Sequence, residues 1–270
     1  MKVQRSAIPK DEGARDTGTL GKAITVLSII AAAGKPPRFT DILALSGQPR
    51  GTLHRQLANL IAEGLITVNR DHSYGLGLRL LQFASRAWAG NQFRTIAEPH
   101  IRKLHEATGE TVHLGVLKGT EVVYLDKIES RQNIRMVSQI GNTAPAWCTG
   151  VGKAALSALP DDELDGRVAA ICFTRYTPHT ITDAKSLLDE IDRIRREGNA
   201  YDREEHEVGI CCVAAPIHAA DRQLFAGVSV TGPAYRITPD LLQSWSGITR
   251  AAAVSIMADL ATQLSPRGSA

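Results

Sequence analysis

Residues 38–77 read RFTDILALSGQPRGTLHRQLANLIAEGLITVNRDHSYGLG, and the spacing of their apolar residues decides the fold of the first part of the chain. After Pro49, apolar side chains recur every three or four residues, at Leu53, Leu57, Leu60 and Ile61. This is the period of one face of a helix. Pro49 suits the first helical position and Gly64 a left-handed C-terminal cap, so the pattern predicts a helix over 49–63.

Two further helices are predicted before this one. Thr40 can cap a short helix that ends at Leu45, and Ser46-Gly47-Gln48 then forms the turn into the next helix. Farther upstream, apolar residues over 23–31 keep a helical period until Gly34. The three helices are therefore expected to share one small core.

After Gly64 the pattern changes to that of two short strands. Residues 65–68 and 73–76 are predicted as strands, with the polar residues 69–72 as the tip between them. Helices followed by a hairpin form a winged helix-turn-helix, whose last helix enters the major groove of double-stranded DNA. The expected DNA contacts are Arg50, Gly51, Thr52, His54, Arg55, Asn59 and, at the tip of the wing, Arg70.

The distribution of charge supports DNA as the partner of the first part alone. Residues 1–90 contain 12 Lys and Arg against 6 Asp and Glu, whereas residues 91–270 contain 19 against 22. A basic module therefore precedes a mildly acidic remainder, as expected if only the first contacts phosphate.

The same patterns divide the chain into five parts: a flexible leader over 1–18, the winged helix-turn-helix over 19–77, a linker helix over 78–90, a second domain over 91–265 and a tail over 266–270. The linker helix carries Leu80, Leu81, Ala84 and Trp88 along one side. This side could pack on its own module or meet its copy in a second subunit. We favour the copy because one recognition helix reads too few base pairs for specificity.

The second domain is predicted to be α/β, which makes the chain a two-domain α+β/α/β protein. The predicted helices cover 95–107, 182–198 and 239–264, and the predicted strands cover 111–116, 121–125, 209–217 and 225–231. No internal repeat is present.

Composition excludes several classes of protein. The longest apolar run, 23–33, is too short to cross a bilayer, and the first nineteen residues lack the apolar centre of a signal peptide. Four cysteines in 270 residues, two of them the neighbours Cys211 and Cys212, do not suggest a disulfide framework. A cytoplasmic protein without membrane partners is expected.

Two separated segments carry a resemblance to a known family. Gly198–Glu205 with Cys212–His218, and Pro145–Ala154 before them, resemble the signatures of the IclR (isocitrate lyase regulator) family of bacterial transcription regulators. The match fails at Ala219, where Asp or Asn is usual. The resemblance implies a DNA-binding module joined to a GAF-like effector-sensing domain, assembled as homodimers or homotetramers. It implies no catalytic residue, cofactor or metal, and leaves repression and activation both open.

The resemblance also implies a site for a small organic acid. The implied effector contacts are Gly150, Val151, Asp202, Cys212, Ser229 and Thr231. The period of a strand points Ser229 and Thr231 to one face, and amides at the start of a helix after Thr149 favour an anion. Asp202 repels an acid unless it is protonated or hydrogen-bonded to a ligand hydroxyl. Apolar walls are expected from Trp147, Val116 and Leu114.

Plainer and competing interpretations remain for these residues. Ser229 and Thr231 could satisfy backbone groups, Cys212 could be a core residue, and 202–207 could be a polar turn. A thiol hydrolase would use Cys211 or Cys212 with His206 or His218 and Asp202. A zinc-binding sensor would use Asp202, Glu205, His206 and Cys212. Both alternatives are weaker, because no cationic setting for the thiol and no paired ligand spacing is visible.

Overall fold

The computed structural model describes residues 18–132, 138–219 and 223–264, and the chain divides into two compact units, 1–90 and 91–270. The predicted tail, the last residue of the predicted second domain, and all of the predicted leader except Gly18 lie outside the described residues. Among the described residues, no helix combines the length and the apolar character that a bilayer span requires.

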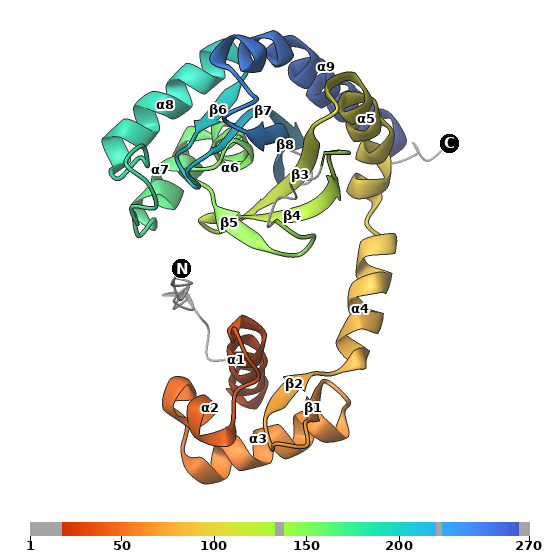
Figure 1. Cartoon of the computed structure of the whole chain (residues 1–270), viewed down its shortest axis with the longest axis vertical. Coiled ribbons are helices and arrows are strands. Elements are labelled where there is room, and N and C mark those ends of the chain that lie inside the picture. Colours follow the sequence, from red (N-terminus) through yellow and green to blue (C-terminus); the bar gives the residue numbers. More distant parts are fainter. Residues whose placement is uncertain (1–17, 133–137, 220–222, 265–270) are drawn as a thin grey trace. The chain divides into compact units, whose positions relative to one another are not determined.

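Unit 1 contains the predicted helices and hairpin (Figure 1). Its elements are α1 (Gly18–Ala32), α2 (Phe39–Ser46), α3 (Arg50–Ala62), β1 (Ile66–Val68), β2 (Tyr74–Leu76) and α4 (Leu78–Ala89). One core joins the first three helices to the hairpin through Val26, Ile29, Ile30, Ile42, Leu53, Leu57, Leu60 and Ile66. The predicted winged helix-turn-helix is confirmed, and Gly64 has the expected positive φ of 66°.

The start of α2 differs from the prediction. Arg38 precedes the helix, and its backbone N–H donates to Asp41 Oδ2 at 2.8 Å. Thr40, predicted as the cap, lies inside the first turn. A carboxylate at the third position of a helix can reach back to the N–H that precedes it, so the side chain of Asp41, rather than that of Thr40, satisfies a backbone donor at the start of this helix.

The apolar side of α4 remains uncovered within unit 1. The helix buries none of its residues, and Leu78 and Leu81 are 78% and 66% exposed. Arg79 pairs with Glu63 and lies over the Phe83 ring, but neither contact buries the apolar side. Of the four residues on the predicted side, Leu80 is half-buried and Leu81, Ala84 and Trp88 are exposed, so the described part of the module leaves most of that side uncovered.

Unit 2 is a six-stranded antiparallel sheet with helices on both faces (Figure 1). Its elements are α5 (Gln92–Thr108), β3 (Thr111–Lys118), β4 (Glu121–Ile128), β5 (Thr143–Pro145), α6 (Gly150–Ser157), α7 (Asp161–Ala169), α8 (Ala184–Glu197), β6 (Ala200–Arg203), β7 (Ile210–Ala219), β8 (Leu224–Pro233) and α9 (Pro239–Leu264). The strand order is β5-β4-β3-β8-β7-β6, and every neighbouring pair is antiparallel. The predicted α/β domain is confirmed.

Different helices cover the two faces of this sheet. α5 and α9 pack on one face, together with Val228 and Val230 of β8. α6 and α8 pack on the opposite face, together with Ala214 of β7. Because side chains alternate along a strand, Ser229 and Thr231 point toward the α6 side.

Three elements of unit 2 were not predicted: β5, α7 and β6. The strands β5 and β6 are only three and four residues long, too short to show a period in the sequence. Residues 202–207, for which a polar turn was one prediction, begin inside β6, where Asp202 pairs with Cys212 of β7. Pairing with a neighbouring strand, rather than local sequence, defines β6.

Candidate functional site

A cavity of about 310 Å³ lies between the sheet and the first turn of α6. It is lined by His113, Tyr124, Ser138, Asn142, Thr143, Ala144, Thr149, Gly150, Val151, Asp202, His206, Glu207, Ile210, Cys212, Ser229 and Thr231. All six residues predicted to contact an effector, Gly150, Val151, Asp202, Cys212, Ser229 and Thr231, are among them. The structure brings these residues together, while their contact with an effector stays a prediction.

Strand register explains why residues far apart in the sequence meet here. Asp202 pairs with Cys212 across β6 and β7, and Cys212 pairs with Thr231 across β7 and β8. Paired residues point to the same face of a sheet, so the three side chains form one polar row. Ser229 lies beside this row, with its hydroxyl 3.4 Å from that of Thr231.

A glycine allows α6 to approach this row closely. Thr149 caps the helix, since its Oγ1 accepts the Gly152 N–H at 3.2 Å and donates to the Pro145 carbonyl at 2.7 Å. A Cβ at Gly150 would lie 2.4 Å from the Cys212 Sγ. A larger residue there would displace the thiol. The first-turn amides of α6 thus remain beside the cavity, where they favour an anionic group.

His113 and Tyr124 line the cavity but were not predicted. His113 Nδ1 lies 3.3 Å from Thr231 Oγ1 and Nε2 lies 2.8 Å from Ser138 Oγ, while its ring centre is 4.9 Å from that of Tyr124. Burial, together with the charge of Lys127, lowers the pKa of His113 to about 3, so the ring is neutral. Strand alternation could have located this histidine once its apolar neighbours on β3 were assigned to the opposite face.

The predicted apolar walls are wrong. Leu114 and Val116 of β3 lie with the core that packs against α5 and α9, on the other face of the sheet. Trp147 belongs to the core beneath α6 and α8, where its ring meets those of Phe173 and Tyr176. The apolar part of the described lining comes instead from residues such as Tyr124, Val151 and Ile210.

Asp202 is the acid at the inner end of the polar row. It is 5% exposed, and its Oδ1 accepts the Glu205 N–H at 2.8 Å. Burial, followed by the charge of Glu205, raises the pKa of Asp202 to about 7, although backbone N–H groups and Lys153 oppose the rise. This carboxyl therefore titrates near neutral pH.

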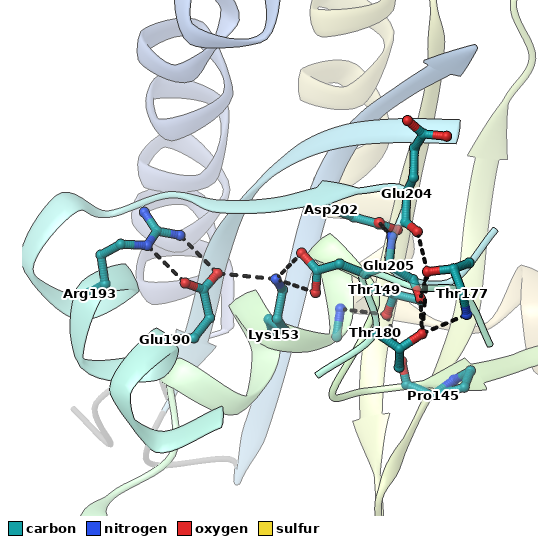
Figure 2. Close-up of polar contacts among 11 residues, drawn as sticks. Pro145, Thr149, Lys153, Thr177, Thr180, Glu190, Arg193, Asp202, Glu204 and Glu205 are labelled. Atoms are coloured by element: carbon teal, nitrogen blue, oxygen red, sulfur yellow. Dashed lines mark hydrogen bonds and ion pairs between the residues drawn. The ribbon is translucent and has the colours of Figure 1, made fainter. Parts of the chain in front are cut away.

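Lys153 of α6 lies at the centre of a buried ion network (Figure 2). Its Nζ lies 2.6 and 2.7 Å from the two carboxylate oxygens of Glu205, and 3.1 Å from Glu190 of α8. Arg193 Nε donates in turn to Glu190 at 2.8 Å. Burial alone would lower the pKa of Lys153, but the two carboxylates outweigh it and raise that pKa. The network ties α6 and α8 to the turn that follows Asp202.

Two threonines donate hydrogen bonds to the backbone of the same turn. The hydroxyl of Thr177 donates to the Glu204 carbonyl and that of Thr180 to the Glu205 carbonyl, each at 2.6 Å. Figure 2 shows both hydroxyls pointing at this stretch of backbone. The turn behind the cavity is therefore held by Lys153 of α6 and by the two threonines of the segment before α8.

The protonation states and contacts of the residues involved do not fit the hydrolase and zinc alternatives. Burial raises the pKa of the Cys212 thiol, so it is protonated and weakly nucleophilic, and burial lowers the pKa of His206. Glu205, a predicted zinc ligand, pairs with Lys153 instead. Within the described residues, no three His, Cys, Asp or Glu side chains are grouped to hold a metal ion.

The predicted DNA contacts lie on the outer side of unit 1. On α3, Arg50, Gly51, His54, Arg55 and Asn59 are exposed and Thr52 is half-buried, while Arg70 is exposed at the hairpin tip. The buried side of α3 includes Gln56, whose Nε2 donates to the Thr19 carbonyl at 3.3 Å. The Arg50 guanidinium lies 5.2 Å from the centre of the Phe39 ring. The helix thus presents one polar and partly basic face to solvent.

Family models match both units of the chain. The IclR helix-turn-helix domain matches residues 19–70, and the model described as bacterial transcriptional regulator IclR C-terminal matches residues 87–258. The chain belongs to the IclR family. Its winged helix-turn-helix is therefore the DNA-binding domain of an IclR-family transcription regulator.

Individual IclR-family proteins match over most of their length. The HTH-type transcriptional repressor AllR of Salmonella typhi is 31% identical over 88% of either chain. The IclR structure from Thermotoga maritima is 32% identical, with a TM-score of 0.68, over 90% of this chain and 98% of that one. An IclR homolog from Microbacterium hydrocarbonoxydans, 23% identical over 91% and 100% of the two chains with a TM-score of 0.73, shares the fold. IclR-family relatives carry the names of regulators, and the chain is a regulator rather than an enzyme.

Proposed function

We propose that this IclR-family protein is a cytoplasmic repressor that binds a pseudo-palindromic operator as a homodimer or homotetramer and responds to a small organic carboxylate. The observation that carries the proposal is a cavity with a row of polar side chains, in a chain that also holds a DNA-binding domain. A relative named as a repressor favours repression.

For DNA, we propose that the start of α3 lies in the major groove. Arg50, Thr52 and Arg55 would meet base edges or phosphates, with Gly51, His54 and Asn59 beside them, and Arg70 would hold the backbone from the wing. Two modules would then read half-sites about one helical turn, roughly 34 Å, apart.

For assembly, we propose that the exposed apolar side of α4 pairs with a second copy. Leu78 and Leu81 are highly exposed on a helix with no buried residue, and an exposed apolar patch of this kind marks an interaction surface. Pairing of these helices would set the spacing of the two DNA-binding modules. An effector would then act by binding one arrangement of the helices more tightly than another.

For the effector, we propose a carboxylate held by the amides of Gly150 and Val151 and by Asp202, Cys212, Ser229 and Thr231. The structure of the Microbacterium homolog was solved in complex with 4-hydroxybenzoate, which makes this compound a suitable first probe.

The test is binding to duplex DNA from the chromosomal neighbourhood of the gene, measured over a range of salt concentrations. Arg55→Ala is expected to weaken binding. Arg70→Ala is expected to reduce the slope of log affinity against log salt concentration by about one, because one counterion fewer is released. Arg102→Ala, which removes the same charge from the exposed side of α5, serves as the control. Unchanged affinity in Arg55→Ala and Arg70→Ala alike would refute the proposed DNA contacts.

A further inference from the structure

Acids outnumber cations around the inner end of the cavity. Lys153 and Arg193 carry two positive charges, and their partners Glu205 and Glu190 carry two negative ones. Asp202 lies next to this balanced set and adds a third acid. Lys153 already contacts both of those glutamates, so an ionised Asp202 would have no cation of its own among these groups.

The other titratable groups that face Asp202 do not supply a positive charge to pair with it. Glu207 lies at the same cavity and has the same sign. Burial lowers the pKa of His206 and holds His113 neutral.

The remaining titratable neighbours are acids that burial keeps protonated: Tyr124 on β4, Cys148 before α6, and Cys211 and Cys212 on β7. Burial raises the pKa of each of them. Among the described residues that line the cavity, there is neither lysine nor arginine. Of the cations outside this lining, Lys153 acts on the Asp202 carboxyl, whereas Arg203 lies over the Tyr201 ring and Lys127 contacts Glu129 and donates to the Ser138 carbonyl.

We propose that the effector site is proton-linked: a carboxylate binds when the Asp202 carboxyl is protonated, and this carboxylic acid donates its O–H to an oxygen of the ligand. Above the pKa of the free carboxyl, one proton from solvent enters the complex with each ligand; only the proton on Asp202 changes, and no other covalent bond. The inference rests on the proposed function, in which the cavity receives a small carboxylate. It is supported by the burial of Asp202, which raises its pKa to about 7.

Proton linkage predicts a specific pH dependence of binding. Below the pKa of the free protein, affinity is constant with pH. Above it, affinity falls up to tenfold for each pH unit, because a proton must first be taken up. Asp202→Asn keeps a neutral donor at every pH, so its affinity is expected to be nearly constant between pH 6 and pH 9.

The experiment is calorimetry of 4-hydroxybenzoate, pyruvate and malonate with the full chain at several pH values, in buffers of different ionisation enthalpy to count protons. A tenfold loss per pH unit above neutrality in the wild type, with about one proton taken up, supports the inference. Binding that is equally tight at pH 6 and pH 9 overturns it but leaves the proposed function intact. Failure of all three carboxylates to bind at pH 6 overturns the proposed ligand class, and the inference with it.

A measurement without ligand or variant tests the same point. With carbon-13 in the aspartate carboxyls of the wild-type chain, Asp202 is expected to give a resonance that titrates near neutral pH, whereas ordinary aspartates titrate near 4. If every aspartate resonance has finished titrating by pH 5.5, Asp202 is ionised in the free protein and the inference is wrong.

Discussion

Replacing Lys153 by Met tests whether the buried ion network holds the wall behind the cavity. Lys153 is 1% exposed, and a methionine keeps most of its apolar stem while removing the charge. Glu190 retains Arg193, which donates to it through Nε and Nη2 at 2.8 Å. The uncompensated charge therefore falls on Glu205, which would avoid it by taking up a proton.

The cost of that proton sets the size of the effect. The ordinary pKa of the Glu205 carboxyl is 4.5. Protonating it at about pH 7.5 costs about 4 kcal/mol, and at about pH 5.5 about 1.4 kcal/mol. The unfolded chain holds Glu205 ionised above pH 4.5, whereas the folded variant holds it protonated, so the variant loses stability as pH rises. The larger figure agrees with the roughly 3–5 kcal/mol that removal of one partner from a buried ion pair costs.

Urea unfolding at fixed protein concentration, followed by tryptophan fluorescence, measures this loss. In the double variant Lys153→Met, Glu205→Gln, no unpaired carboxylate remains, so we expect it to be more stable than Lys153→Met at neutral pH. Lys185→Met, which breaks an exposed pair with Asp189 on α8, serves as the control and should change nothing measurable. A Lys153→Met variant whose stability loss is the same at both pH values would refute the reasoning.

Three further predictions concern other parts of the chain. Gly51→Ala should stabilise unit 1 by about 0.5–1 kcal/mol in urea unfolding, because a Cβ there meets nothing within 4 Å; destabilisation would contradict this. Gly150→Ala should weaken binding of 4-hydroxybenzoate at least tenfold in calorimetry, since its Cβ would lie 2.4 Å from Cys212 Sγ, and equal affinity would show that the thiol can move freely. Leu81→Glu should lower the oligomeric state in sedimentation without unfolding the chain, whereas Leu45→Glu, equally exposed on α2, should not; an unchanged assembly would exclude α4 as the interface.

Local patterns predict the elements of this chain where a period is long enough to be read. The helix at 50–62 follows from four apolar residues and a terminal glycine, and the alternation in β8 places Ser229 and Thr231 on one face. Predictions fail where the direction of a side chain depends on elements that are distant in the sequence. Leu114 and His113 are neighbours on one strand, and only the packing of α5 and α9 shows that the histidine, rather than the leucine, faces the cavity.

The charge state of the site is a stronger case of the same dependence on tertiary structure. The family resemblance predicts Asp202 as an acid near the effector, and the sequence also raises the conflict between this acid and an anionic effector. Whether that acid is ionised depends on the neighbours that share its charge, and these come from α6, α8 and the turn after β6. Lys153 is already shared by Glu205 and Glu190, and burial raises the pKa of Asp202 to about 7, so the protonated form that we propose for the complex removes the conflict. An acid that looks unsuitable for binding an anion can become a hydrogen-bond donor when the lysine beside it already pairs with other carboxylates.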